Sequence, residues 1–494
     1  MSAPSGNSGE ASDGRKGGSP RRGAPGGGGS KAGVVVVSNR GPFTLEATAG
    51  GTLRPHPGGG GLAPSLVAAL NGTHGAVWVA AAMSDGDRLG AKAGVVDSGQ
   101  PGLSLRLVAF EPAVFAAAYD VIANATLWFV LHGLYDAARR PVFDKRWYEA
   151  WGAFRRYNEA FASATSEVAG EGAVVLVNDY HLPLVGALLA RSRPDLRTVH
   201  FSHTPFASET ELAMLPRAVA RELMVGMAGF GACGFHSPRW EKAYLRCAEA
   251  AGVRPPLTFA EPLGADRGRL LEVAGSPACT DRLARLESAL GGRRLILRSD
   301  RVELSKNLLR GLVAFNTLLA EHPEWRGQVV HLIRAYASRE TLPEYLAYRS
   351  EVEHLAALVN ERWGSPSYEP VLLEVEDDFA STVAALRRYD VLLVNPIRDG
   401  MNLVAKEGPT LNETSGMLVL SEQAGAYDEL GGAAFGVNPF DVCETAEALH
   451  AALSAGSGVR SARAAELKSL AAVNPPAEWL EKLLAHARTP SLQP

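Results

Sequence analysis

The sequence predicts an α/β protein with two domains, each built on a parallel β-sheet. Its 494 residues exceed what one hydrophobic core comfortably holds, so two domains of about 200 residues each are expected. Short β-branched runs alternate with amphipathic stretches long enough for crossover helices, which is typical of buried parallel strands. The pattern restarts near residue 265, and two such domains facing each other would enclose a cleft.

The overall composition is that of a soluble globular protein. Hydrophobic residues make up 46% of the chain, and 49 basic against 53 acidic side chains leave a net charge of -4. This balance argues against nucleic acid or a membrane surface as the main partner, so local cations must bind any anionic ligand. We expect no apolar run to approach the roughly 18 residues that span a bilayer, and the N-terminus lacks the apolar centre of a signal peptide.

The four cysteines show neither a C-x-x-C pair nor a histidine at zinc spacing. We therefore expect neither a metal site nor a disulfide framework, and a reducing, cytoplasmic location fits. The cysteines are Cys233, Cys247, Cys279 and Cys443.

Residues 1–32 are predicted to form a disordered tail. They are rich in Gly, Ser and Pro with almost no large apolar side chains, so folding would not offset the entropy of ordering them. The run Gly26–Lys31 looks like a phosphate loop, but it lacks the Gly-Lys-Ser/Thr order and a preceding strand. We therefore discard that match.

The first domain, expected over residues 33–265, begins with two candidate ligand loops. The predicted strand Val34–Val37 ends in Ser38-Asn39-Arg40, and a glycine loop that includes Gly60 and Gly61 opens a helical stretch. Glycines would let backbone N–H groups approach a phosphate closely, although Gly-rich turns are common and the signal is weak by itself.

Two later strands of this domain end in polar clusters. The strand Val174–Val177 leads into Asn178 and Asp179, and the next strand leads into His203. Carboxyl ends of parallel strands meet at one sheet edge, which favours a site there over the alternative of a satisfied structural histidine. Tyr119, Trp128 and His132 share a helical spacing, and we interpret His132 as a core residue.

The second domain, expected over residues 266–465, opens with a strand that leads into Arg301 and Lys306. The planar guanidinium of Arg301 beside the compact ammonium group of Lys306 suits a diphosphate ligand. The alternative is that the two side chains are a solvated pair on the surface. The runs that predict its strands are Leu295–Leu297, Val329–Ile333, Val371–Leu373, Val391–Val394 and Met417–Leu420.

The most informative stretch is Arg398–Glu407, which follows Val391–Val394. A buried strand ending in a loop and a helix start leaves backbone N–H groups facing outward, where a phosphate or sugar oxygen binds. Asp399 and Glu407 are candidates to hold polyol hydroxyls; the alternative is an ordinary solvated strand-to-helix turn. Residues 466–494 are expected to contain a final amphipathic helix, Trp479–His486, that crosses back to the first domain.

Together these features resemble the trehalose-6-phosphate synthase family of retaining glycosyltransferases, in its actinobacterial form, from about Val34 to Pro439. The Arg398–Glu407 decapeptide matches the family motif unchanged. The supporting elements are Ser38-Asn39-Arg40, Gly60-Gly61-Leu62, Tyr119 to Trp128 with Asn124, Asp179-Tyr180-His181, His203 with Pro205-Phe206, Arg301 with Lys306, Ser338-Arg339 and Val437-Asn438-Pro439.

The resemblance implies the GT-B fold, two facing Rossmann-like domains, with a nucleotide sugar held mainly by the second and a sugar phosphate mainly by the first. It also implies transfer of glucose to glucose 6-phosphate, giving trehalose 6-phosphate. No cofactor or metal is expected, because two cations and helix-start amides stabilise the leaving diphosphate.

The resemblance also assigns site residues. The implied catalytic residues are Arg301, Lys306, His203, Asp399 and Glu407. The implied donor-binding residues are Gly60, Gly61, Arg301, Lys306, Arg334, Asn402, Leu403, Val404 and Glu407. The implied acceptor-binding residues are Arg40, Tyr119, Trp128, Asp179 and Arg339.

Three positions depart from the family pattern, and two of them, Ala81 and Arg334, concern substrate choice. Ala81 stands where a tryptophan is usual, so a cyclitol phosphate or glycerol phosphate acceptor stays open, as does a non-catalytic sugar-phosphate sensor. Glu303 replaces an aspartate and is expected to be tolerated. Arg334 stands where the donor base is usually met, and its fork predicts GDP-glucose over UDP-glucose; the alternative is that Arg334 points to solvent. A homo-oligomer is compatible with the sequence.

Overall fold

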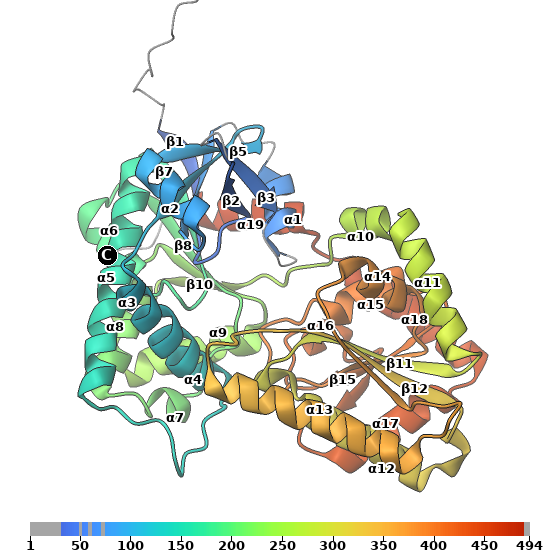
Figure 1. Ribbon diagram of the computed structural model, residues 1–494. Helices are drawn as coiled ribbons and strands as arrows, with labels where there is room; N and C mark the ends of the chain where they lie inside the picture. Colours follow the sequence, from blue (N-terminus) through green and yellow to red (C-terminus); the bar gives the residue numbers. More distant parts are fainter. Residues whose placement is uncertain (1–30, 49–51, 58–61, 71–74, 489–494) are drawn as a thin grey trace, which may run out of the picture.

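The computed structural model describes residues 31–48, 52–57, 62–70 and 75–488. Two domains, each with its own sheet and covering helices, lie against each other (Figure 1). The predicted α/β class with parallel sheets is confirmed, and the seven predicted strand runs all lie within strands. Most of the predicted tail, together with Gly60 and Gly61, lies outside the described residues.

The first sheet has eight strands in the order β10-β9-β8-β7-β1-β4-β6-β5, and only β5 and β6 pair antiparallel. The central strands β1, β4 and β7 carry continuous apolar runs, which is typical of parallel strands with both faces covered. The strands are β1 (Ala32–Val37), β4 (Ala76–Ala81), β5 (Val95–Gln100), β6 (Leu103–Val108), β7 (Ala169–Asn178), β8 (Arg197–Ser202), β9 (Ala232–Phe235) and β10 (Leu257–Ala260); β2 (Phe43–Ala47) and β3 (Leu53–Pro57) form a separate hairpin.

The helices of the first domain surround this sheet. They are α1 (Leu62–Leu70), α2 (Asp85–Ala93), α3 (Pro112–Ala116), η1 (Ala117–Leu127), α4 (Trp128–His132), α5 (Lys145–Val168), α6 (Val185–Ser192), α7 (Glu209–Leu212), α8 (Arg217–Ala228) and α9 (Pro238–Ala250). The segment η1 is a π-helix, continuous with α3 and α4.

The continuous helix Pro112–His132 corrects one sequence expectation. It is long and apolar enough to cross a membrane by length and composition, with a mean hydropathy of 1.6, so the prediction that no run reaches this length is wrong. However, 56% of its most apolar window is buried inside the protein, where side chains such as Ile122 and Phe129 join the core beside α5. Its apolar character is that of a core helix.

The second sheet has six parallel strands in the order β13-β12-β11-β14-β15-β16. The strands are β11 (Arg294–Arg301), β12 (Val329–Tyr336), β13 (Val371–Val375), β14 (Val391–Val394), β15 (Met417–Ser421) and β16 (Phe435–Val437). The helices are α10 (Arg267–Ala274), α11 (Pro277–Leu290), η2 (Leu304–Lys306), α12 (Leu308–Glu321), η3 (Pro323–Trp325), α13 (Pro343–Trp363), α14 (Phe379–Arg388), α15 (Val404–Leu411), α16 (Tyr427–Leu430), α17 (Val442–Ser454) and α18 (Ser457–Ala471).

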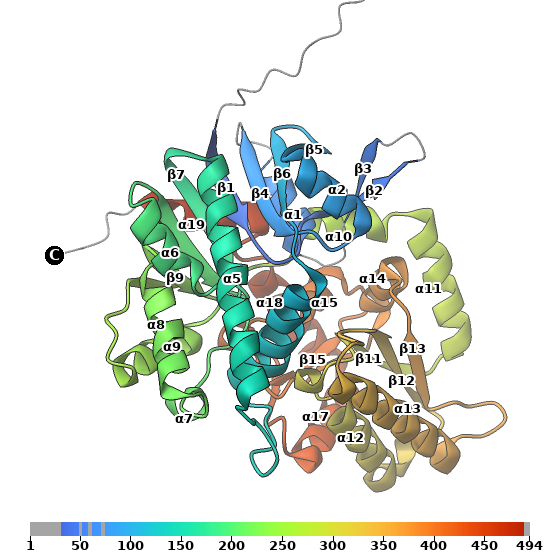
Figure 2. The ribbon, with the colours of Figure 1, turned by 60° about the vertical axis from the view of Figure 1, so that its left-hand side comes forward.

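The chain crosses between the domains twice, at adjacent places. The first crossing joins β10 to α10, and the second joins α18 to α19 (Pro476–Arg488), which returns to the first sheet (Figure 2). The two crossings bond to each other, since Gly264 N donates to Asn474 O at 2.8 Å and Asn474 Nδ2 donates to Pro262 O at 2.5 Å. On α19, Trp479 is 1% exposed and its ring lies edge-on to Phe201 of β8. The predicted boundary at residue 465 falls inside α18, which packs on α15 in the second domain.

Candidate active site between the domains

The predicted cation pair and Asp399 lie together at the carboxyl edge of the second sheet. Arg301 is the last residue of β11, and Lys306 ends η2. Lys306 Nζ lies 2.6 Å from Asp399 Oδ2 and 3.8 Å from Asp300 Oδ1. Burial opposes the charge of Lys306, but Asp399 and Asp300 outweigh it and raise the Lys306 pKa. Lys306 is therefore a charged ammonium group held between two carboxylates, at the sheet edge where the sequence predicts a diphosphate.

The loop between β14 and α15 presents the predicted polyol ligands. Asn402 has φ 75, and its Nδ2 donates to Asp399 Oδ2 at 3.1 Å. Leu403 is the N-cap of α15 and Val404 is its first residue, so the N-terminal backbone amides of this helix lie at this edge. Burial raises the pKa of Glu407, in the first turn of α15, to about 7. This carboxyl group thus changes its charge near neutral pH.

Gly400 brings this loop directly against the first domain. A Cβ on Gly400 would lie 1.9 Å from the carbonyl oxygen of His203, which no side chain tolerates. On its other side, Trp240 Nε1 of α9 donates to Gly400 O at 3.1 Å. The glycine of the motif is therefore a point of backbone contact between domains, and it fixes the distance between their two sheet edges.

The polar clusters after β7 and β8 face this contact and are bonded to each other. Asp179 adopts φ 70, and its Oδ1 accepts from His203 N at 3.2 Å. His203 Nε2 lies 3.0 Å from Asn178 Oδ1, and its Nδ1 lies 3.1 Å from His236 Nε2. Burial lowers the His203 pKa to about 3 and raises the Asp179 pKa to about 6. His203 is consequently a neutral imidazole whose two nitrogens both have protein partners.

Arg339 links the two domains on the predicted acceptor side. It follows β12 with φ 49, and its guanidinium carbon lies 3.8 Å from the ring centre of Trp128. Its Nε donates to Asn124 Oδ1 at 3.0 Å and its Nη2 to Tyr180 Oη at 3.1 Å. The guanidinium of Arg301 lies 5.9 Å from the same Trp128 ring. Cations predicted for two different substrates thus meet around one indole.

The remaining predicted acceptor residues lie beside this group. Arg40 Nη2 donates to Tyr119 Oη at 3.3 Å, and Tyr119 stacks on His181 with ring centres 5.7 Å apart. His132, interpreted as core, is 3% exposed, and its ring stacks on Trp128 at 3.9 Å.

Glu303 is the site residue that sequence reasoning missed. The sequence indicates only a tolerable replacement for aspartate, whereas the side chain of Glu303 is fully buried between Arg301 and Arg339. Its Oε1 lies 3.0 Å from Arg301 Nη1 and 2.7 Å from Arg339 Nη1. No local pattern signals this role, because Glu303 and its partner Arg339 lie 36 residues apart in the chain.

Arg334 lies inside β12 and does not point to solvent, because it is 6% exposed. Its Nη1 pairs with Glu374 of β13, and its Nη2 donates to Asp378 O at 3.5 Å. The Arg334 guanidinium, which was predicted to contact the donor base directly, is therefore already paired with a carboxylate.

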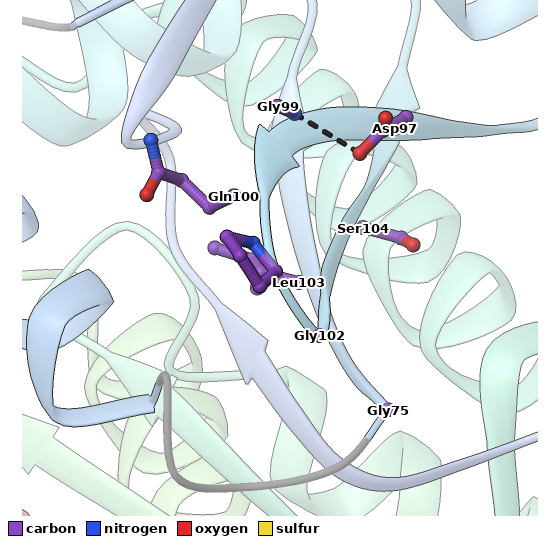
Figure 3. Close-up of a pocket in the computed structure, with 8 residues that line it drawn as sticks. Gly75, Asp97, Gly99, Gln100, Gly102, Leu103 and Ser104 are labelled. Atoms are coloured by element: carbon purple, nitrogen blue, oxygen red, sulfur yellow. Dashed lines mark hydrogen bonds between the residues drawn. The ribbon is translucent and has the colours of Figure 1, made fainter.

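Two other features lie away from this site. A pocket on the β5–β6 edge of the first sheet is lined by Asp97, Gln100 and Ser104, and none of the predicted site residues lines it (Figure 3). Among the described residues, His322, Glu324 and His450 form a group of metal-ligand types. Their candidate ligand atoms lie within 4.8 Å of one another, but Trp325 Nε1 already donates to His450 Nδ1 and the two imidazoles stack with ring centres 3.7 Å apart.

The chain is similar to known proteins over most of its length. A family model described as glycosyltransferase family 20 matches residues 32–489. A trehalose-6-phosphate synthase from Mycolicibacterium vanbaalenii is 33% identical over 454 residues, which cover 86% of this chain and 89% of the relative. A validamine 7-phosphate valienyltransferase from Streptomyces hygroscopicus subsp. jinggangensis is 31% identical over 460 residues, which cover 89% of this chain and 90% of the relative.

A longer relative is matched only in part. A bifunctional trehalose-6-phosphate synthase/phosphatase from Thermoproteus tenax is 31% identical over 441 residues, which cover 85% of this chain but 58% of the relative. Among solved structures, an E. coli protein bound with UDP-2-fluoro glucose superposes with a TM-score of 0.81 at 26% identity, covering 92% of this chain and 99% of that chain.

Proposed function

The chain belongs to glycosyltransferase family 20, and from this premise we propose that it is an alpha,alpha-trehalose-phosphate synthase. The proposed reaction moves glucose from a nucleoside-diphosphate glucose to glucose 6-phosphate. The observation that carries the proposal is the meeting of Arg301, Lys306 and Arg339 at the domain contact, with Asp399 beside them. Three cations suit one diphosphate and one phosphate brought together.

The donor is proposed to bind the second domain. Arg301 and Lys306 would neutralise the diphosphate as it leaves, and the amides at Leu403 and Val404 would add helix-start donors. Asp399 and Glu407 would accept hydroxyl protons of glucose and ribose. This arrangement needs no divalent cation, because the protein itself supplies the positive charge.

The acceptor is proposed to bind between Arg339 and the first domain, where Arg40, Tyr119 and Trp128 would receive its phosphate and Asp179 its hydroxyls. The departing phosphate oxygen, on the same face of the glucose ring as the attacking hydroxyl, would take the hydroxyl proton. Such a path retains the anomeric configuration without a protein nucleophile. The electrostatics required by a positively charged sugar transition state come from the buried carboxylates.

The finer part of the proposal concerns the donor base. A row of residues leads from Glu407 along the second domain. Arg269 is near enough to Glu407 to lower its pKa, against the rise that burial causes. The guanidinium carbon of Arg269 lies 5.0 Å from the ring centre of Phe379. Next to Phe379, the Asp378 carbonyl accepts from Arg334. A nucleotide whose ribose binds Glu407 would extend its base along this row.

We propose guanine as that base, read through the partner of Arg334. Glu374 pairs with Arg334, and its side chain is 48% exposed. A carboxylate held in this way accepts the N1–H and 2-amino groups of guanine, whereas uracil offers one N–H between two repelling carbonyl oxygens. This reading preserves the predicted preference for GDP-glucose but transfers the contact from Arg334 to Glu374.

Donor competition tests this part of the proposal. Wild-type protein is expected to turn over GDP-glucose faster than UDP-glucose, and Glu374→Gln to shift the ratio about tenfold toward UDP-glucose, since a good base contact is worth roughly 1–3 kcal/mol. Equal turnover of both donors by wild-type protein would remove the guanine preference.

A different acceptor is the second candidate. Ala81 ends β4 where the family usually has tryptophan, and a relative of similar length is named for a 7-phosphate of validamine. A cyclitol phosphate would place the same anionic group at Arg339. A non-catalytic sensor is less well supported, because Arg301, Lys306, Asp399 and Glu407 are all present. Location in the cytoplasm and assembly as a homo-oligomer also remain proposals.

One matrix of donors against acceptors decides between these functions. GDP-glucose and UDP-glucose are each incubated with glucose 6-phosphate, a cyclitol phosphate and glycerol phosphate, and products are scored by mass. Trehalose 6-phosphate is the expected main product. Turnover with the cyclitol phosphate alone would replace the proposed acceptor, and no turnover in any combination would favour the sensor.

A further inference from the structure

Glu303 is placed between two arginines that the proposed function assigns to different substrates. Its Oε1 receives Arg301 Nη1 at 3.0 Å and Arg339 Nη1 at 2.7 Å, and Ser338 Oγ donates to the same atom at 2.7 Å. The other oxygen, Oε2, is also buried and has no hydrogen-bond partner among the described residues. The carboxylate therefore binds both arginines through a single oxygen atom.

The charge of Glu303 is secure. Burial alone would raise its pKa, but Arg301, Arg339 and Lys306 outweigh burial and lower the pKa to about 2. Without this anion the two guanidinium groups would face each other with no charge between them, and each already disfavours the other electrostatically. The carboxylate thus sets how far apart the two cations stand.

Arg339 connects Glu303 to the first domain. Its three nitrogens contact Glu303, Asn124 and Tyr180, and the latter two belong to the first domain. A ligand that fixes Arg301 therefore also restricts Glu303, Arg339 and the domain contact. A second ligand that binds an already ordered cluster loses less conformational entropy, which gives positive coupling.

We propose that Glu303 is a positioning residue that couples the donor subsite at Arg301 to the acceptor subsite at Arg339, so that each substrate strengthens the binding of the other. The inference rests on the proposed function, which assigns those two arginines. It adds a role for a residue that touches neither reacting atom.

Calorimetric titration of the free nucleoside diphosphate, with and without saturating glucose 6-phosphate, tests this coupling. In wild-type protein the sugar phosphate is expected to tighten nucleotide binding about fivefold or more, the lower end of usual coupling free energies. In Glu303→Gln, which keeps the shape but removes the charge, the tightening is expected to disappear. The affinity of either ligand alone is free to rise or fall, because removing an anion near two phosphates has opposing effects.

Two further variants separate coupling from folding. Ser338→Ala removes one hydrogen bond to Glu303 and touches no proposed substrate contact, so it is expected to weaken the coupling at least twofold while folding normally. Asp428→Asn is the matched control, because it breaks the interdomain pair with Arg239, 2.5 Å long, elsewhere in the contact. Its coupling should stay at the wild-type value.

The outcomes are distinct. The inference is overturned if Glu303→Gln shows the same coupling as wild-type protein. If Glu303→Gln does not fold, wild-type coupling in Ser338→Ala overturns it instead. Absence of coupling in the wild-type protein also overturns it. If the product assay shows another acceptor phosphate, the proposed acceptor fails, and the titration is run with that phosphate. Coupling lost equally in Asp428→Asn would also overturn the inference, because any interdomain ion pair would then suffice.

Discussion

At the scale of single residues, the proposed donor subsite is held together by opposite charges. Lys306 and Asp399 form an ion pair at 2.6 Å, and both side chains are mostly buried. An incoming diphosphate would compete with Asp399 for Lys306 and leave the Asp399 carboxylate free to accept a sugar hydroxyl. The pair therefore keeps each group charged and correctly placed until substrate arrives.

Replacing Lys306 with alanine is expected to reduce turnover severely. One preorganised contact to a developing anion contributes about 2 to 4 kcal/mol, or roughly 30- to 1000-fold in kcat. Initial rates with saturating substrates measure the effect, and Lys145→Ala, an exposed lysine on α5, is the matched control. A Lys306→Ala rate within a factor of a few of wild type would contradict the assigned role.

Glu407 is expected to make donor binding depend on pH. Burial raises its pKa to about 7, so the group is protonated below that pH and ionised above it. The ionised form is the better acceptor for ribose hydroxyls, and the donor KM should therefore fall as pH rises from about 6 to 8. Glu407→Gln should flatten this part of the profile. A steep profile that survives the substitution would assign the titration to another group.

At the scale of elements, the loop between β14 and α15 shows how little room the domain contact leaves. Gly400 lies against the carbonyl of His203, and Gly425 lies against the carbonyl of Gly400 itself. Three backbone segments from two domains thus stack without side chains between them. The residues that follow, from Asn402 to Glu407, keep their positions because this stack fixes the start of α15.

Gly400→Ala is expected to abolish most activity while the domains remain folded. The added methyl group must push the loop and His203 apart, and a displacement of about 1 Å costs roughly 100-fold in rate. kcat/KM and the melting temperature are measured together. Gly432→Ala is the control, since a Cβ there meets nothing within 4 Å. Equal activity of the two variants would show that the contact yields easily.

The elements were predictable wherever local pattern decides them. Apolar runs such as Val391–Val394 predict strands because parallel strands are buried on both faces, and each predicted run lies in a strand. Helical spacing also placed Tyr119 and Trp128 in one helical segment. It did not predict the π-helical turns of η1, because they have no simple sequence periodicity.

The unpredicted parts depend on contacts between distant residues. The pairing of Arg334 with Glu374 and the bridge of Glu303 to Arg339 arise from neighbouring strand ends, which are far apart in sequence. Motif residues could be assigned to the site one by one, whereas the partner of each charge could not. The close approach of Gly400 to His203 likewise exists only once two domains are placed together.

At the scale of the whole molecule, α19 joins the end of the described chain to the first sheet. Trp479 is 1% exposed, lies edge-on to Phe201 and donates through Nε1 to Glu261 O at 3.0 Å. The helix therefore closes the core of a domain whose other elements precede residue 265. Cooperative unfolding of the first domain should depend on it.

Trp479→Ala is expected to lower the free energy of unfolding by about 3–5 kcal/mol, the usual cost of deleting a buried aromatic side chain. Denaturant unfolding monitored by circular dichroism measures the loss, and Val473→Ala, 52% exposed nearby, is the control. A change no larger than that of the control would show that α19 contributes little to the stability of the first domain.

The paired crossings at Gly264 and Asn474 have a mechanical consequence. A single connecting segment would let the two domains rotate freely about it. Two connecting segments that are hydrogen-bonded side by side are expected to act as a hinge. We expect any opening of the second domain to follow one axis, because the bonded pair of segments resists twisting. Such a motion would let substrates enter and leave while the two sheet edges return to the register in which they meet.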